Sequence, residues 1–442
     1  MIQPRTLKGF RDFLPSTMMP REELIDTAKK VYRSYGFAPI DTPVLELFDI
    51  LNGKGGEESD RLMYNFEDRG GRRVGMRFDL TVPLARFVAQ HANDLGMPFK
   101  RYHIAKVWRG ENTHRGRYRE FTQCDFDTIG TTSVASDIET LLVIHDLFSA
   151  IGIGDFTMRV NHRQVLNGLL EKLGLLDQAA NILRSLDKLG KIDRDAVIRE
   201  MVDNGVATID QASAVLKITD IQGAPGQMLE AAAELVAGSE RGERGVERLQ
   251  EVVSGANAGG VPADRIQIDV SIARGLDYYT GTIVETFLDQ LPSIGSVCSG
   301  GRYDDLAGTY TKQQLPGIGA SLGLDRLLAA MEELTLLGES AAAAPALLTQ
   351  FDASRLHDYL KLANTLRQTG IGVEFYPDPK KIGQQLKFAD RRGFRVALIA
   401  GDQEFEQNQV QIKDLKTGMA TNASLEHDAS AVVAKLKELL SS

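Results

Sequence analysis

Cysteine is scarce in this sequence, which contains two among its 442 residues, Cys124 and Cys298. That number excludes a disulfide framework and a cysteine-rich zinc fold. No apolar run approaches the roughly 18 to 20 residues that a membrane span needs. The GxxxxGK[ST] phosphate loop, the HExxH metal motif and the GxSxG nucleophile motif are missing as well. A nucleotide would therefore have to be held by side chains and a sheet, and not by a glycine loop at a helix start.

Positive charge is also in short supply, because 51 Lys and Arg face 60 Asp and Glu and give a net charge of -9. This balance argues against a protein that coats nucleic acid through bulk positive charge. The N-terminal segment MIQPRTLKGFRDFLPS has no hydrophobic signal core. The composition, 43% hydrophobic and 25% charged, is that of a globular protein with its own cores. We therefore expect a soluble, cytoplasmic protein.

Hydrophobic patterning divides the chain into three regions. The first, to about Asn161, combines a helical segment with short extended pieces, and lacks the strand–helix rhythm of a parallel sheet. An antiparallel α+β layout is the better prediction. The second region is helical and ends in the glycine-rich stretch GANAGG, which indicates a linker. Apolar and polar residues then alternate from Ile266 to Ile272 and predict a half-buried strand, so the helical block is interpreted as an insertion.

The third region follows the small-residue linker SAAAAPA and shows a different rhythm. Strand and helix patterns alternate here, which predicts a compact α/β domain of roughly a hundred residues. The expected strands cover 346–349, 372–376 and 395–400, and the expected helices cover 355–367 and 382–392.

The densest charged segment runs from Lys100 to Arg119 and contains nine Lys, Arg or His in twenty residues. A solvated basic face is the plain interpretation of such a run. Extended patterns on both sides instead favour a hairpin whose basic, glycine-containing loop grips phosphates. On the second strand, Gln123, Asp125 and Asp127 share one face. Three polar residues in mid-sheet are costly to bury unless a ligand uses them, so we expect a polar cavity there.

Three further segments have the composition of a binding site. ARGLDYYTGTIVE follows the alternating strand and carries two adjacent tyrosines with hydroxyl tips. SGGRYDDLAG contains a glycine pair that indicates close approach of the backbone to a ligand or to another strand. GIGASLGLDRLLAAM is a glycine-rich strand pattern that runs into a helix carrying Arg326. Because glycines clear space beside it, we expect this arginine to point into a site.

Together these segments resemble the histidyl-tRNA synthetases, a family of class II aminoacyl-tRNA synthetases, over essentially the whole chain. GFAPIDTPVLE is similar to motif 1, the dimer-interface element, VWRGENTHRGRYREFTQCDFD to motif 2, and GLDRLL to motif 3. RGLDYYTGTIVE and GGRYDDL resemble the two signature segments particular to the histidine enzymes. The resemblance implies an antiparallel-sheet catalytic domain over 1–335, interrupted by a helical insertion over about 165–260. It also implies a C-terminal α/β anticodon-binding domain over 345–442.

The same resemblance implies an ATP-dependent histidine–tRNA ligase. Such an enzyme activates histidine with ATP to histidyl-adenylate and pyrophosphate, and then transfers histidine to the 3′ end of tRNA(His). The implied partners are L-histidine, ATP with Mg²⁺ as a substrate complex, tRNA(His) and a second copy of the chain, with no membrane and no protein-bound metal. The helical insertion is expected to clasp tRNA.

Site residues follow from the resemblance position by position. Arg274 and Arg109 are the implied catalytic residues, with Arg109 clamping the α-phosphate and the substrate carboxylate. The ammonium of histidine would bind Asp79 and Thr81, and the imidazole nitrogens would bind Asp127 and Tyr279. The implied histidine-binding set is Asp79, Thr81, Arg109, Gln123, Asp127, Arg274, Tyr278, Tyr279 and Tyr303. The implied ATP-binding set is Arg109, Glu111, Arg117 and Arg326.

Three alternatives remain at this point. The first is a regulatory subunit of ATP phosphoribosyltransferase that binds histidine and charges no tRNA; the presence of Arg274 and of a C-terminal module argues against it. The second is another class II synthetase, such as one for threonine or proline. The third is a catalytically inactive RNA-binding homologue, which would have no reason to retain Arg109, Arg274 and Arg326 together.

Overall fold

The computed structural model describes residues 1–52, 62–189, 192–272, 278–337 and 342–441. Its contacts divide the chain into two units. The larger comprises Met1–Arg11 and Leu24–Leu336, and the smaller comprises Asp12–Glu23 and Leu337–Ser442. Within the described residues, no helix is both long and apolar enough to cross a membrane.

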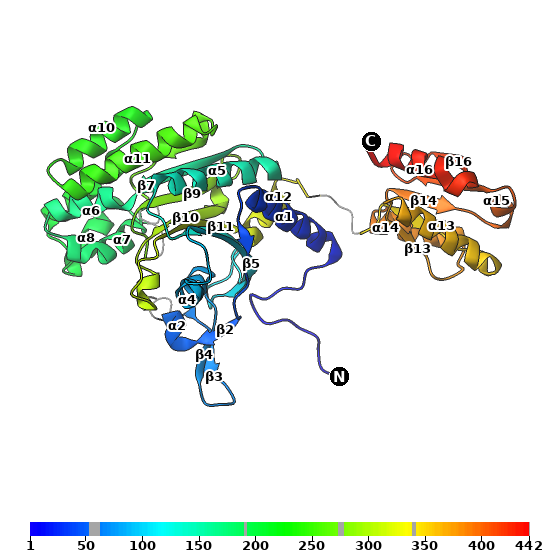
Figure 1. The fold of residues 1–442 in the computed structure, drawn as a ribbon, viewed down its shortest axis with the longest axis horizontal. Coiled ribbons are helices and arrows are strands. Elements are labelled where there is room, and N and C mark those ends of the chain that lie inside the picture. The colour runs from blue at the N-terminus through cyan, green and yellow to red at the C-terminus, as the bar shows by residue number, and fades with distance from the viewer. Residues whose placement is uncertain (53–61, 190–191, 273–277, 338–341, 442) are drawn as a thin grey trace. The chain divides into compact units, whose positions relative to one another are not determined.

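A large mixed sheet forms the centre of the larger unit (Figure 1). Neighbouring strands are antiparallel throughout its middle, and only the outer pairs β1–β5 and β7–β8 are parallel. The predicted antiparallel α+β class is therefore confirmed. In spatial order the strands are β1 (Ala38–Pro39), β5 (Phe99–Trp108), β6 (Glu120–Ile129), β11 (Gly317–Gly323), β10 (Cys298–Tyr303), β9 (Thr282–Leu288), β7 (Phe156–His162) and β8 (Ile266–Ile268).

Apolar side chains on the sheet pack against flanking helices. Tyr32 of α1 is fully buried, packs on the ring of Phe126 and donates its hydroxyl to the carbonyl of Cys124. Cys124 and Phe126, on the face of β6 away from Asp125 and Asp127, thus belong to the core. The helices that frame the sheet are α1 (Pro15–Ser34), α4 (Thr81–His91), α5 (Val134–Ile151) and α12 (Leu324–Glu333).

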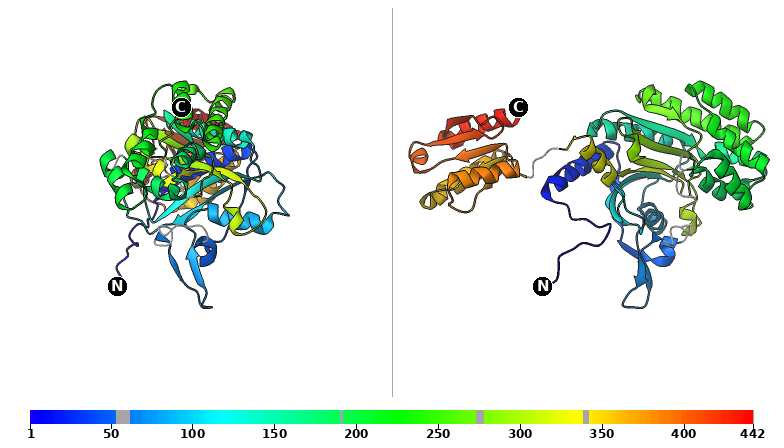
Figure 2. Two further views of the ribbon diagram at one scale, coloured as in Figure 1. Left: turned by 90° about the vertical axis from the view of Figure 1, so that its left-hand side faces the viewer. Right: turned by 180° about the vertical axis from the view of Figure 1, so that it is seen from behind.

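A small antiparallel sheet projects from the larger unit in the views of Figures 1 and 2. It consists of β2 (Leu45–Leu47), β4 (Arg73–Met76) and β3 (Asn65–Glu67), and the short helix α2 (Phe48–Asn52) follows β2. Residues 38–47, one of the short extended pieces of the first region, are divided between β1 of the large sheet and β2 of the small one.

The predicted helical insertion is present and gathers at the β7 side of the sheet (green in Figures 1 and 2). Helix α11 packs on α5 and α6 through glycines; a Cβ on Gly255 would lie 2.3 Å from Cδ1 of Ile138. The interpretation of GANAGG as a linker is therefore wrong for its first four residues, which are the end of α11. The helices are α6 (Arg163–Lys172), α7 (Ala179–Leu186), α8 (Arg194–Asp203), α9 (Ile209–Leu216), α10 (Pro225–Val236) and α11 (Glu240–Ala258).

The strand predicted from Ile266 to Ile272 is shorter than expected, because β8 ends at Ile268. Burial still alternates through Ile272. The backbone turns because the Asp269 carboxylate accepts a hydrogen bond from the amide of Ser271 at 3.1 Å, and Ile272 donates to the Asp269 carbonyl. Side-chain bonds of this kind compete with strand pairing.

The smaller unit contains a second sheet in the order β13–β12–β14–β15–β16. The predicted strand–helix alternation is confirmed over its first five elements, whereas the antiparallel pair β15–β16 was not predicted. A separate apolar core that includes Leu348, Tyr359 and Val432 lies between sheet and helices. The elements are β12 (Ala346–Leu348), α13 (Leu356–Gln368), β13 (Val373–Phe375), α14 (Ile382–Arg392), β14 (Val396–Ile399), α15 (Asp402–Glu406), β15 (Gln409–Asp414), β16 (Ala420–Ser424) and α16 (Glu426–Ser441).

Candidate active site

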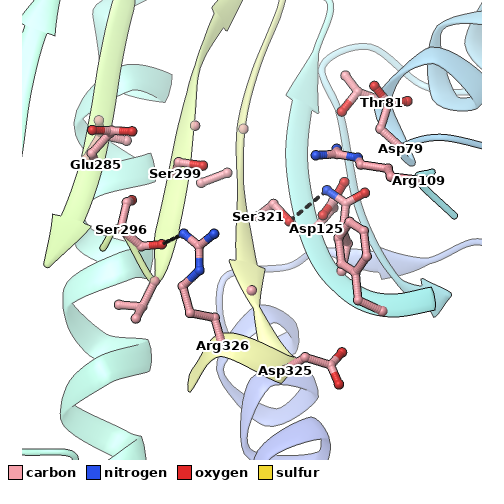
Figure 3. A pocket seen from close by; sticks show the side chains of 18 of the residues that line it. Asp79, Thr81, Arg109, Asp125, Glu285, Ser296, Ser299, Ser321, Asp325 and Arg326 are labelled. Carbon is pink, nitrogen blue, oxygen red and sulfur yellow. Dashed lines mark hydrogen bonds between the residues drawn. The ribbon is translucent and has the colours of Figure 1, made fainter. Parts of the chain in front are cut away.

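One cavity of about 270 Å³ opens over β6, β11 and β10 in the larger unit (Figure 3). Its lining brings together every described residue of the predicted site, although these residues come from distant parts of the sequence. They are Asp79, Thr81, Arg109, Glu111, Arg117, Gln123, Asp127, Tyr278, Tyr279, Tyr303 and Arg326. The remaining predicted residue, Arg274, lies outside the described residues.

Three buried carboxylates, Asp79, Asp125 and Asp127, form what we call the acidic end of the cavity. Asp79 precedes α4 and accepts a hydrogen bond from the amide of Val82 at 3.0 Å. Asp127 accepts a hydrogen bond from the hydroxyl of Tyr303, and its Oδ2 lies 2.6 Å from Nη2 of Arg101. The alternation of β6 thus places two carboxylates on the cavity face, as the sequence predicted.

Burial governs the protonation of these carboxylates. Loss of hydration raises the pKa of Asp79 and of Asp127. The amide of Val82 and the guanidinium of Arg109 oppose the increase most for Asp79, and the guanidinium of Arg101 does so for Asp127. Burial raises the pKa of Asp125 to about 7; Arg101 opposes the increase and the neighbouring charge of Asp127 adds to it. Asp125 therefore titrates near neutral pH.

Glycines on the neighbouring strands make room for the acidic end. Gly319 pairs with Asp127 across β11 and β6, and a Cβ at this glycine would lie 2.2 Å from Oδ1 of Asp127. A Cβ at Gly317 would lie 2.5 Å from the ring of Tyr303. The close approach expected of the glycine pair in SGGRYDDLAG is confirmed with a neighbouring strand, because a Cβ at Gly300 would lie 2.2 Å from the carbonyl oxygen of Gly319.

Aromatic rings close the cavity beside the carboxylates. Tyr278 packs edge-to-face on Tyr279 and Tyr303, with ring centroids 5.1 and 5.8 Å apart. Its hydroxyl is hydrogen-bonded to Thr81, and burial raises its pKa well above the usual value. The three tyrosines therefore present neutral hydroxyl groups to a ligand, as hydrogen-bond donors or acceptors.

Arg109 follows directly after β5 and is fixed by both the backbone and aromatic rings. Its Nε donates to the carbonyl of Phe78 at 3.0 Å, and its guanidinium lies 4.3 Å from the Phe78 ring centroid. The loop that follows returns to the sheet as β6, so the predicted β-hairpin is confirmed. Figure 3 shows Arg109 beside Asp79 and Thr81, at the edge of the acidic end.

Arg117 and Arg326, with Glu111, form what we call the arginine end. Glu111 accepts a hydrogen bond from Nε of Arg117 and lies 3.9 Å from Nη1 of Arg109. Arg326, in the first turn of α12, donates to the carbonyl of Ser296 (Figure 3). Gly116 packs against the Arg326 side chain, so the hairpin loop and α12 meet here. Two guanidinium groups thus converge where a polyphosphate can be bound.

The described residues contain no group of three or more His, Cys, Asp or Glu side chains that could hold a metal ion. Among the described residues that line the cavity, the positively charged ones are Arg109, Arg117 and Arg326.

The match to known families decides the family of this chain. Residues 9–327 match the family model described as histidyl-tRNA synthetase, and residues 349–439 match the anticodon binding domain. The chain belongs to the histidyl-tRNA synthetase family. The alternative of a synthetase for threonine or proline is therefore wrong.

Individual relatives of this synthetase family extend the match over nearly the full length. A histidine–tRNA ligase from Rhodopirellula baltica is 60% identical over 97% of each chain, and one from Wolinella succinogenes is 43% identical over 95% of each. The crystal structure of histidyl-tRNA synthetase from Nostoc sp. PCC 7120 has a TM-score of 0.88 at 34% identity, covering 99% of this chain and 100% of that one. The class II synthetase fold with a C-terminal anticodon-binding domain follows from these matches.

Two residues at or beside this cavity are not identified by the sequence-based prediction. Arg101 belongs to the basic run of residues 100–119, yet its side chain is fully buried next to Asp127. Asp125 was recognised as a polar strand residue but was not assigned to the site. The signal that could have identified Arg101 is strand register, since β5 places it directly opposite Asp127 on β6. The signal for Asp125 is the alternation of β6, which puts it on the same face as Gln123 and Asp127.

Proposed function

We propose that this cavity carries out histidine activation, the first step of the histidine–tRNA ligase reaction, and that both steps follow the course known for the family. ATP and histidine give histidyl-adenylate and pyrophosphate, and the histidyl group then passes to tRNA. The observation that supports this proposal most strongly is the assembly of one acidic, buried end and one arginine-rich end in a single cavity.

The acidic end binds histidine. The ammonium group is bound by Asp79 and Thr81, which lie beside the cavity at the start of α4. The imidazole nitrogens are bound by Asp127 and Tyr279, with Gln123, Tyr278 and Tyr303 lining the same pocket. Because these polar groups are buried, a side chain without two ring nitrogens leaves them unsatisfied, and this penalty provides the selectivity.

The arginine end binds ATP. Arg109 lies between the two ends and is placed to contact both the substrate carboxylate and the α-phosphate, while Arg117, Glu111 and Arg326 hold the rest of the nucleotide. ATP enters as its Mg²⁺ complex, with the ion as part of the substrate. The carboxylate oxygen of histidine attacks the α-phosphorus, and the bond to the bridging oxygen of pyrophosphate breaks. Catalysis then consists of positioning and of positive charge on the phosphoryl oxygens.

Arg274 is proposed as a second catalytic arginine on the basis of its place in the RGLDYY signature. Its substitution by alanine is expected to reduce the rate of adenylate formation by orders of magnitude while the fold remains intact.

The C-terminal domain over 345–442, which we call the C-terminal unit, binds tRNA at a surface separate from the cavity. Its basic side chains include Lys380, Lys381, Lys387, Arg391 and Arg392, at the start of α14 and within it. The helical insertion also clasps tRNA, in addition to the C-terminal unit. We keep 1–335, with its insertion over about 165–260, and 345–442 as the proposed domain boundaries.

The working form is proposed to be a cytoplasmic homodimer. Support for dimerisation comes from the motif 1-like segment and from exposed apolar side chains on the small sheet. Leu45, Leu47 and Phe66 are 45%, 52% and 48% exposed. Cytoplasmic location is supported by a cysteine content that suits a reducing compartment.

ATP–pyrophosphate exchange tests the proposed activation step. The purified chain is assayed with each of the twenty amino acids in turn, at saturating ATP and Mg²⁺. We expect exchange with histidine and none above background with the others. Absence of histidine-dependent exchange, or equal exchange with several amino acids, would contradict the proposal.

A further inference from the structure

The structure contains one fully buried cation that the proposed mechanism does not use. Arg101 lies in β5 with no measurable exposure, directly opposite Asp127 on β6 and outside the lining of the cavity. Its Nη2 is 2.6 Å from Oδ2 of Asp127, and its Nε and Nη1 have no hydrogen-bond partner among the described residues. The ion pair with Asp127 is therefore the main compensation for burying this charge.

Other groups around Asp127 cannot replace Arg101. The Tyr303 hydroxyl donates a hydrogen bond from β10 but carries no charge. Asp79, before α4, is a like charge that raises the pKa of Asp127, and the charge of Asp127 in turn raises the pKa of Asp125 on the same strand. Tyr279, at the cavity wall, is a neutral phenol whose pKa is itself raised by burial. Arg101 is thus the positive charge that faces Asp127 directly among the described residues.

We infer that Arg101 is a positioning residue for substrate recognition, which keeps Asp127 ionised and fixes its Oδ2 so that the carboxylate can accept a hydrogen bond from the imidazole of histidine. This inference rests on the proposed histidine site. Arg101 does not line the cavity and contacts no substrate; it acts through Asp127.

The position of Arg101 explains how it compensates Asp127 without facing the ligand. It lies directly opposite Asp127 on β5, on the other side of β6 from β11, and is not among the residues that line the cavity. With three buried carboxylates at this end, a single internal cation also leaves net negative charge for the substrate ammonium. The arrangement separates stabilisation of the carboxylate from recognition of the amino acid.

The pH dependence follows from the sign of the effect of Arg101. Because the guanidinium lowers the pKa of Asp127 against the effect of burial, its removal raises that pKa further. More Asp127 is then protonated at a given pH, and the affinity for histidine recovers as pH rises and the carboxylate regains its charge. We divide KM for histidine in each variant by KM of the wild type at the same pH, because this ratio cancels the effect of the ionisation of histidine itself.

The test compares Arg101→Met, Arg101→Gln and Arg101→Lys with the wild type in ATP–pyrophosphate exchange between pH 6.5 and 8.5. For the two neutral variants we expect KM for histidine at pH 7 to rise about 10- to 100-fold, and this ratio to fall as pH increases. KM for ATP should stay within about twofold. Arg101→Lys, which keeps the charge, should lie between the wild type and the neutral variants. Either neutral variant suffices if the other does not fold.

A control variant sharpens the result. Lys106→Met is the matched control, because Lys106 lies on the same strand with its side chain 52% exposed; its kinetic constants should equal those of the wild type.

The possible failures can be told apart. If the wild type shows no histidine-dependent exchange, the proposed function fails and this inference fails with it. If the wild type is histidine-dependent and a folded neutral variant keeps wild-type KM and pH dependence, only the role of Arg101 is contradicted. Equal weakening of histidine and ATP, without pH dependence, would show a merely structural role and also overturn the inference.

Discussion

The acidic end and the arginine end of the cavity hold their charges in opposite ways. At the acidic end the Asp127 side chain is 5% exposed and paired with the fully buried Arg101. At the arginine end the Arg117 side chain is 49% exposed and paired with Glu111 at the cavity surface. A buried charge needs a fixed counter-charge, whereas an exposed guanidinium can exchange one anionic partner for another with little loss.

The difference indicates a division of labour within one pocket. The acidic end is fixed by strand pairing, by glycines that admit its side chains and by Arg101, so it is suited to selecting one amino acid. At the arginine end, Arg117 donates a hydrogen bond to Glu111 and Arg326 donates one to the carbonyl of Ser296. A polyphosphate can replace both acceptors. Specificity is therefore expected to depend on the first end and rate on the second, with Arg109 serving both.

The largest effect is expected from Arg109→Ala, because Arg109 lies where the two ends meet. Its removal takes positive charge from the site of phosphoryl transfer and should lower kcat/KM for exchange about 10²- to 10³-fold. Arg115→Ala is the matched control, since Arg115 belongs to the same loop but pairs with Glu332 and Glu333 outside the cavity. Similar losses in both variants would contradict the assignment.

Removal of the C-terminal unit should separate the two steps of the reaction. A chain that ends at residue 340 retains the cavity but loses the second binding module for tRNA. Exchange should remain within a few-fold of the full chain, and aminoacylation of tRNA should fall about 10²-fold. An equal loss in both assays would show that the cavity does not work independently of the C-terminal unit.

Gly319→Ala should damage the acidic end alone. The added methyl group would lie 2.2 Å from Oδ1 of Asp127 and must displace that carboxylate. We expect KM for histidine to rise about 10-fold or more, with KM for ATP little changed. Gly308→Ala is the control, because a Cβ at that exposed glycine meets no atom within 4 Å. Unchanged histidine kinetics in Gly319→Ala would show that the close contact is not required.

The smallest effect concerns stability and pH. Burial raises the pKa of Asp125 to about 7, so the folded state binds a proton that the unfolded state releases near pH 4. The stability from this proton is present at low pH and is lost as pH rises from about 4 to about 7. Asp125→Asn keeps a neutral side chain, so its advantage in unfolding midpoint over the wild type should grow between pH 5 and pH 8, by a free energy of a few kcal/mol at most. A constant difference would contradict the assigned titration.

The sequence predicts which residues line the cavity better than it predicts their charge interactions. Motif resemblance identified the residues from Asp79 to Arg326 that line the cavity, and the polar face of β6 was visible in its alternation. Arg101 could not be separated from its basic neighbours, because burial of a strand residue depends on the strands and helices packed around it. Register with β6, which is a long-range property, decides that Arg101 faces Asp127.

The same limit applies to the fold. Local patterns identified the hairpin β5–β6, the helical insertion and the first five elements of the C-terminal unit. The predicted strand that begins at Ile266 is too long, because the alternation of buried and exposed residues continues through a turn that the side chain of Asp269 stabilises. The glycines at the end of α11 predict a linker, because glycine is common both in flexible segments and where helices pack closely. The contact of Gly255 with Ile138 of α5 shows that this glycine serves helix packing.

Calorimetric titration of histidine in the absence of ATP tests the division of labour most directly. The wild type, Asp127→Asn and Arg326→Ala are compared at pH 7.5. If the acidic end alone selects histidine, we expect Asp127→Asn to weaken histidine binding at least about tenfold, and Arg326→Ala to bind histidine as the wild type does. Equal affinities in all three proteins, or a loss of histidine binding in Arg326→Ala, would contradict it.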